Sequence, residues 1–356
     1  MKTHIINLLG RPALVPALLL FLFVARPAHA GRVDPRYIPP DAKWMIHLDV
    51  DTLVQSKTWS ILSPRFHMMV NKRQFVIGMQ PPLSTQGTND NVKTVSQALG
   101  MRLPEDIHAM TLIGRSFDDN GVVLLIKATV DRDRLTGMAK LSPQYKSTQY
   151  RGFELDALGE NTVCWAFLSP DVIVLAQTPE DVKQQIDFVS QTTQPTQSEA
   201  SDVPLLQNAE QFQGASVFLY TTADGLQELQ KQEQLSPILT PVKRFQACIG
   251  ERDDDLVLRA VLNVDTDESA RQVRGALEGI RALATLTASN GNNPKAQMVS
   301  DLASRATTSV SQKSVEVDWP VPLSTVETFI DTFLGHHHAH GAKTLTRPAP
   351  APGVSD

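Results

Sequence analysis

Two stretches, VVLLIKATVD at residues 122–131 and LVLRAVLNVD at residues 256–265, decide the fold of this 356-residue chain. Each follows an acidic turn, at residues 118–121 and 253–255, and each ends in Val-Asp before a segment with helical periodicity. Runs this rich in aliphatic residues predict strands, and Asp-Asn-Gly tolerates the positive φ that a tight hairpin turn requires. Each stretch is therefore expected to be the second strand of a hairpin that leads into a helix.

The regions before these hairpins also correspond. WMIHLDVDTL at residues 44–53 and SVFLYTTADGL at residues 216–226 each run from an apolar strand into an Asp that can cap a helix. The shared order predicts an internal duplication; the alternative is that hairpins followed by helices are common and resemble each other by shared physics. We expect a first half at residues 31–190, a linker at residues 191–204 and a second half at residues 205–334.

Antiparallel hairpins interleaved with single helices predict the α+β class. The expected architecture is two similar halves, each a mostly antiparallel sheet with helices packed on one face. Thr178, with Pro179 after it, predicts a helix start, and Val182, Ile186 and Val189 then share one face. In the second half, the segment 267–286 carries an apolar stripe that is expected to cover a sheet, composed of Val273, Leu277, Ile280 and Ala284.

The first thirty residues read as a secretory signal peptide. Lys2 and Arg11 precede the apolar run at residues 17–25, and Ala28-His29-Ala30 has the small-x-small pattern of a cleavage site. The sequence therefore predicts an exported, soluble protein, periplasmic or extracellular, with no transmembrane span in the mature chain. Removing residues 1–30 lowers the formal charge from −5 to −8, which disfavours nucleic acid as a partner.

The two cysteines, Cys164 and Cys248, lie in strand-like runs. Alternation in NTVCWAFL puts Cys164 with Ala166 and Leu168 on one face, opposite Val163, Trp165 and Phe167. Buried residues of this type are found both as free thiols and in bridges. Two buried free thiols and a single disulfide, which export would permit, both remain open.

The richest group of metal ligands is at the C-terminus, where His336, His337, His338 and His340 crowd into five residues. Neutral imidazole is a good ligand for Zn, Cu or Ni, and Asp331 could add an oxygen. Glycines flank the cluster, and a Pro- and Ala-rich tail completes residues 335–356. The alternative to a physiological metal site is thus a solvated tail that binds metal adventitiously.

Two further groups could carry chemistry. Asp49 and Asp51 lie two residues apart near the end of a strand, and His47 shares their face. They could act as an acid and a base, but the favoured interpretation has Asp51 capping a helix, Asp49 ending the strand and His47 partly buried. The acidic turn that begins at Asp118 offers oxygen ligands for calcium, yet it lacks the spacing of a calcium loop, so a simple hairpin turn is expected.

No familiar catalytic or cofactor motif occurs in the chain, and none of the common hydrolase or phosphate-binding signatures is present. We therefore expect a non-catalytic binding or interaction protein without a cofactor, whose partner is an envelope protein or ligand. A first alternative is metal handling through the histidine cluster. A second is a hydrolase whose active site is assembled from residues far apart in the sequence.

The segment Ile38-Pro39-Pro40-Asp41-Ala42, followed by the strand into Asp49 and Val50, resembles a group of uncharacterised exported bacterial proteins. Their mature domains open with a Pro-x-x-Ala motif and an apolar strand that ends in Asp. The resemblance covers about residues 38–62. It implies a bacterial cell-envelope setting and carries no activity and no functional residues.

Overall fold

The computed structural model describes residues 33–63, 101–102, 105–117, 121–159, 163–191, 215–232, 240–289 and 294–334. In the first half its elements are η1 Pro35–Tyr37, β1 Trp44–Asp49, α3 Val50–Val54, β2 Ile107–Gly114, β3 Val122–Ala128, α6 Arg132–Ala139, β4 Tyr145–Tyr150, β5 Phe153–Leu158, β6 Val163–Ser169, β7 Val172–Ala176 and α7 Pro179–Gln191. In the second half they are β8 Ala215–Thr221, α8 Ala223–Gln232, β9 Val242–Arg252, β10 Asp255–Val264, α9 Asp267–Ser289, α10 Pro294–Arg305, β11 Thr307–Ser311, β12 Ser314–Pro322 and α11 Leu323–Leu334.

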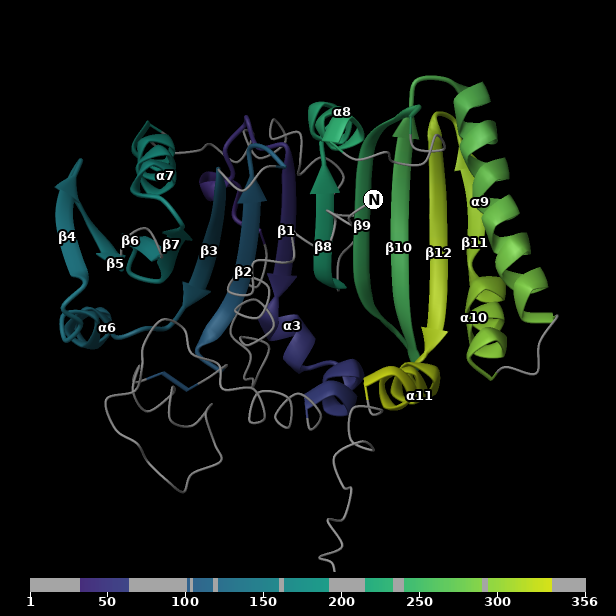
Figure 1. Ribbon diagram of the computed structural model, residues 1–356, viewed down its shortest axis with the longest axis horizontal. Coiled ribbons are helices and arrows are strands. Elements are labelled where there is room, and N and C mark those ends of the chain that lie inside the picture. The colour runs from purple at the N-terminus through teal and green to yellow at the C-terminus, as the bar shows by residue number, and fades with distance from the viewer. Residues whose placement is uncertain are drawn as a thin grey trace, which may run out of the picture.

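The strands form one continuous sheet of twelve, in the order β11-β12-β10-β9-β8-β1-β2-β3-β7-β6-β5-β4 (Figure 1). Every pairing in this sheet is antiparallel. The α+β class and the antiparallel pairing are as predicted. The two separate sheets are not: β1 and β8 pair directly, with Ile46 opposite Leu219, so the strands of both halves share one sheet.

The β1–β8 pair is the seam between the halves, and polar contacts flank it. Glu228 on α8 forms an ion pair with Lys43 and accepts a hydrogen bond from the Phe117 backbone N–H at 2.9 Å. On β9, Glu251 accepts hydrogen bonds from the backbone N–H groups of Lys57 and Thr58. Each contact joins residues from different halves, so backbone pairing and carboxylate contacts both hold the seam together.

Helices pack on both faces of the sheet, whereas one face was expected. Because side chains alternate along a strand, Val123 and Leu125 of β3 face one side and Leu124 and Ile126 the other. On the first face, η1 and α7 pack against Val123 and Leu125. The strand register shows that the second face continues into the second half, where α8 and α9 cover it. In the first half, α3 covers the same face near β2 and α6 covers it near β6.

Two local predictions are confirmed. Trp165 and Phe167 lie in the cluster beside α6, while Cys164, Ala166 and Leu168 lie in the cluster on the opposite face. The side chains of Val182 and Ile186 are fully buried on the predicted face of α7. Strand alternation and helix periodicity were sufficient here because each element contacts the core along its whole length.

Both cysteines are free and buried. Cys164 lies on β6 and Cys248 on β9, and five strands separate them in the sheet. At ~4.8 Å per strand spacing the separation is roughly 29 Å, far beyond the reach of a disulfide. The structure therefore contains two buried free thiols and no disulfide between them, which is one of the two alternatives that the sequence left open.

Candidate functional site

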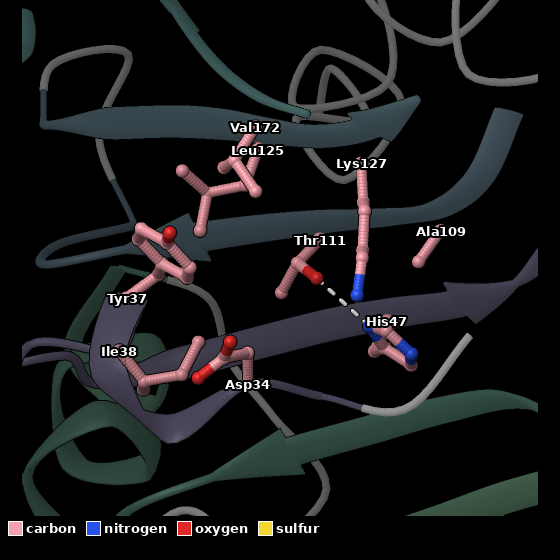
Figure 2. A pocket seen from close by; sticks show the side chains of 9 residues that line it. All are labelled: Asp34, Tyr37, Ile38, His47, Ala109, Thr111, Leu125, Lys127 and Val172. Atoms are coloured by element: carbon pink, nitrogen blue, oxygen red, sulfur yellow. Dashed lines mark hydrogen bonds between the residues drawn. The ribbon is translucent and has the colours of Figure 1, made fainter. Parts of the chain in front are cut away.

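The candidate site is a small pocket with a mostly apolar lining on the first face of β1, β2 and β3, beside η1 (Figure 2). Its free volume is about 30 Å³, which is room for one or two water molecules. The polar groups in its wall come from η1 and from all three strands, and the rest of the wall is apolar. The lining residues are Asp34, Tyr37, Ile38, His47, Ala109, Thr111, Leu125, Lys127 and Val172.

His47 is the most buried polar group of this pocket, with 1% of its surface exposed. It lies directly opposite Thr111 in the β1–β2 register, and its Nδ1 is 2.8 Å from the Thr111 Oγ1. Figure 2 shows the Lys127 side chain pointing toward the same imidazole from β3. His47 is therefore hydrogen-bonded to the neighbouring strand and is more deeply buried than the partly buried residue that we expected.

Asp49 and Asp51 have separate roles. Asp49 is the N-cap of α3: its carboxylate accepts hydrogen bonds from the Thr52 backbone N–H and from the Thr52 hydroxyl, both at 2.8 Å. We expected Asp51 to be the cap, but the cap is Asp49, two residues earlier, so the helix begins at Val50 and Asp51 lies in its first turn. The two carboxylates therefore do not work as a pair, because Asp49 is committed to the helix end.

Asp51 instead forms the inner end of a three-residue chain. Its Oδ1 lies 3.2 Å from the Nδ1 of His108 on β2, and the Nε2 of His108 lies 3.1 Å from the Oγ1 of Thr129, just after β3. The other carboxylate oxygen, Asp51 Oδ2, is buried without a hydrogen-bond partner. Burial raises the pKa of Asp51, and the hydrogen bond to His108 opposes that shift.

Sequence reasoning missed both His108 and Thr129. The register between β2 and β3 shifts between Ile107 and Ala109, so His108 falls at an irregularity of the strand. Strict alternation along β2 would not place His108 beside residues of two other elements. A bulge of this kind has no reliable pattern in a single sequence, and Asp51 is separated from His108 by a long stretch of chain.

The predicted metal ligands His336, His337, His338 and His340 lie outside the described residues, as does the acidic turn at residues 118–120. The described part of the chain holds no cluster of three or more His, Cys, Asp or Glu side chains that could bind a metal ion. The corresponding turn in the second half joins β9 to β10, with Asp253 at a φ of +59°. It is a hairpin turn, as predicted.

The largest departure from prediction is at α9. Val273 is buried against the sheet and Leu277 packs there too, but Ile280 is 52% exposed. Leu283 is 65% exposed and Leu286 62%. These three residues, here called the apolar ridge, follow one another at three-residue spacing along the helix. Figure 1 shows α9 and α10 beside β11 at one end of the sheet, where few elements surround them.

Among the residues that the structure describes, no helix combines the length and the hydropathy needed to span a membrane.

Comparison with known proteins gives no family for this chain. No family model matches it, and no curated protein sequence matches it. Among solved structures, crystal form I of TP0453 aligns with a TM-score of 0.41 at 10% identity, covering 85% of this chain and 98% of TP0453. Crystal form III gives a TM-score of 0.44 at 9% identity, with coverage of 85% and 100%.

Proposed function

We propose that this chain is an exported interaction protein of the bacterial cell envelope, built from two like halves, and that it binds another protein through the apolar ridge of α9. The observation that carries the proposal is the exposure of Ile280, Leu283 and Leu286, each more than half exposed on one helix. Isolated apolar residues are normal on a protein surface, but a group of large ones marks an interaction site.

The charges around the ridge define the chemistry of the partner. Arg281 lies on α9 beside the ridge and its Nη1 donates to the Ala306 carbonyl at 2.8 Å, while Arg305 and Asp301 are both exposed on α10. Residues 278–305 carry a formal charge of +1, from Arg281, Lys295 and Arg305 against Glu278 and Asp301, in a chain with a formal net charge of −5. The partner that fits has an apolar surface, in which Leu283 would be buried, bordered by carboxylates that face the two arginines.

The pocket beside His47 is too small to be the binding site for an organic ligand. A free volume of about 30 Å³ is far below the roughly 300–1,000 Å³ of pockets that enclose organic ligands. An ordered water fits there, whereas a metabolite does not. A protein partner needs no such cavity, because its contact area lies on the outside of the fold.

The test is capture of partners from native cell envelopes with Leu283→Glu as the variant and Leu141→Glu as the matched control. Leu141 is 83% exposed and lies after α6, far along the chain from α9. We expect chemical cross-linking followed by mass spectrometry to recover the same partner with the wild type and the Leu141→Glu control, and to lose it with Leu283→Glu. Equal recovery with both variants would contradict the proposal.

A further inference from the structure

We propose that Asp51, His108 and Thr129 form an acyl-transfer centre that hydrolyses small carboxylic esters, with Thr129 as the nucleophile. This inference goes beyond the interaction role and uses a different part of the molecule. It rests on how three side chains from α3, β2 and the end of β3 are arranged relative to one another.

The hydrogen bonds run in the order that nucleophilic catalysis requires. The carboxylate faces Nδ1 of the imidazole at 3.2 Å, and the hydroxyl faces Nε2 at 3.1 Å. In the tautomer whose proton is on Nδ1, that N–H donates a hydrogen bond to Asp51, and the unprotonated Nε2 accepts one from the Thr129 hydroxyl. Both distances are within the hydrogen-bond reach expected of a nucleophile, its base and the group that orients the base.

Burial decreases from Asp51 through His108 to Thr129, as nucleophilic catalysis requires. Asp51 is 8% exposed. The His108 side chain is 21% exposed, and Thr129 is on the surface. A buried carboxylate holds the ring and stabilises its charged form, while an exposed hydroxyl can reach a substrate. Asp51 is thus a positioning residue, and His108 and Thr129 are the residues that would contact the reacting atoms.

The backbone fixes the position of the hydroxyl. The Thr129 N–H donates to the Asp106 carbonyl at 2.7 Å, and the Asp106 carboxylate in turn holds Arg102. Thr129 stands between β3 and Asp131, which caps α6 by accepting from the Arg134 N–H at 3.0 Å. The backbone hydrogen bond and the two flanking elements limit where the hydroxyl can lie, and a fixed position favours reaction from one geometry.

The reaction balances with these groups and water alone. His108 Nε2 takes the hydroxyl proton of Thr129 as its oxygen bonds to the ester carbonyl carbon, and the proton then passes to the departing alcohol as its bond to the acyl carbon breaks. Water, deprotonated by the same nitrogen, attacks the acyl-Thr129 ester. The carboxylic acid leaves and Thr129 recovers its proton. The Thr129 hydroxyl is exposed and does not line the pocket beside His47, and we expect short acyl groups as substrates.

The experiment measures hydrolysis of p-nitrophenyl acetate by the full chain. We expect Thr129→Val and His108→Gln to lower the protein-dependent rate by at least about 100-fold, as removal of a nucleophile or a general base does. Thr129→Ser should retain the activity, and Thr148→Val, an exposed threonine of β4, should equal the wild type. Asp51→Asn should reduce kcat with little change in KM.

Two readouts separate catalysis from a structural role. Acid quenching followed by peptide mass spectrometry should find the acetyl group on Thr129. Circular dichroism checks that Thr129→Val is folded. No hydrolysis by the wild type, wild-type rates in Thr129→Val or His108→Gln, or an acetyl group found only on other residues would overturn the proposal. None of these results bears on the apolar ridge.

Discussion

Trp44 lies against Gly114 so closely that the glycine cannot carry a side chain. The two residues are opposite each other in the β1–β2 register, and a Cβ at Gly114 would lie 2.1 Å from Cε2 of the indole. The ring is 6% exposed, its Nε1 donates to the Ser116 carbonyl at 2.7 Å, and it stacks on Phe117 with centroids 5.8 Å apart. The indole therefore has several contacts that prevent it from moving aside.

Gly114→Ala is expected to destabilise the protein by about 1–3 kcal/mol, the usual cost of overpacking a core. Gly137→Ala is the matched control, because a Cβ at Gly137 meets nothing within 4 Å. Gly137 lies inside α6, where alanine is favoured over glycine by roughly 0.8–1 kcal/mol. Urea denaturation should thus show opposite signs for the two variants, and equal stability would contradict the close contact.

Both thiols are expected to react slowly in the native protein. Burial raises the pKa of Cys248 to about 11 and also raises the pKa of Cys164. A raised pKa leaves less thiolate, the reactive form, at pH 8, so reaction with a thiol reagent should be slow there and should accelerate as the pH rises. Two thiols per chain should react at once in denaturant without a reductant. Fewer than two would indicate a disulfide or a modified cysteine.

Cleavage between the halves is expected to leave them associated. The nick is made at a protease site introduced between residues 195 and 196, inside the predicted linker. Because β1 and β8 are paired along five residues and Glu228 and Glu251 contact the other half, the fragments should coelute in gel filtration under native conditions. Separation of folded fragments would show that the seam is weaker than the backbone pairing implies.

The histidine hypothesis can be tested by a chain that ends at Leu334. If the cluster His336 to His340 binds metal stoichiometrically, native mass spectrometry should find zinc, copper or nickel on the full chain and none on the shortened one. The midpoint of thermal unfolding without metal should be the same for both forms. Retention of metal by the shortened chain would place the ligands elsewhere and remove the tail from consideration.

What could be predicted from the sequence was local. Alternation around Cys164 and helical periodicity after Thr178 each describe a single element against its neighbours, and both predictions are confirmed. The seam could not be predicted in this way, because the register of Ile46 with Leu219 joins distant parts of the chain. Ile280 was misplaced for a related reason: periodicity shows which residues share a helix face, but not where the sheet beneath the helix ends.

The candidate site was predicted only in part. His47, Asp49 and Asp51 were identified because they are close in the sequence, but Thr111 and His108, the partners of His47 and Asp51, were not. A hydrogen bond across a sheet depends on register, and the register near His108 is irregular. Residues that are far apart in the chain and come together only in the folded state produce no regular spacing that could be recognised in a single sequence.

The seam at β1 and β8 also affects how the protein folds during its synthesis. The first half is synthesised before β8 exists, and during that interval β1 is an unpaired edge carrying Trp44, Ile46 and Leu48. An apolar edge strand of this kind can pair with another chain as readily as with its own. Correct folding therefore depends on the timing of synthesis as well as on the match between β1 and β8. The second half must be synthesised, or a chaperone must cover β1, before two nascent chains meet.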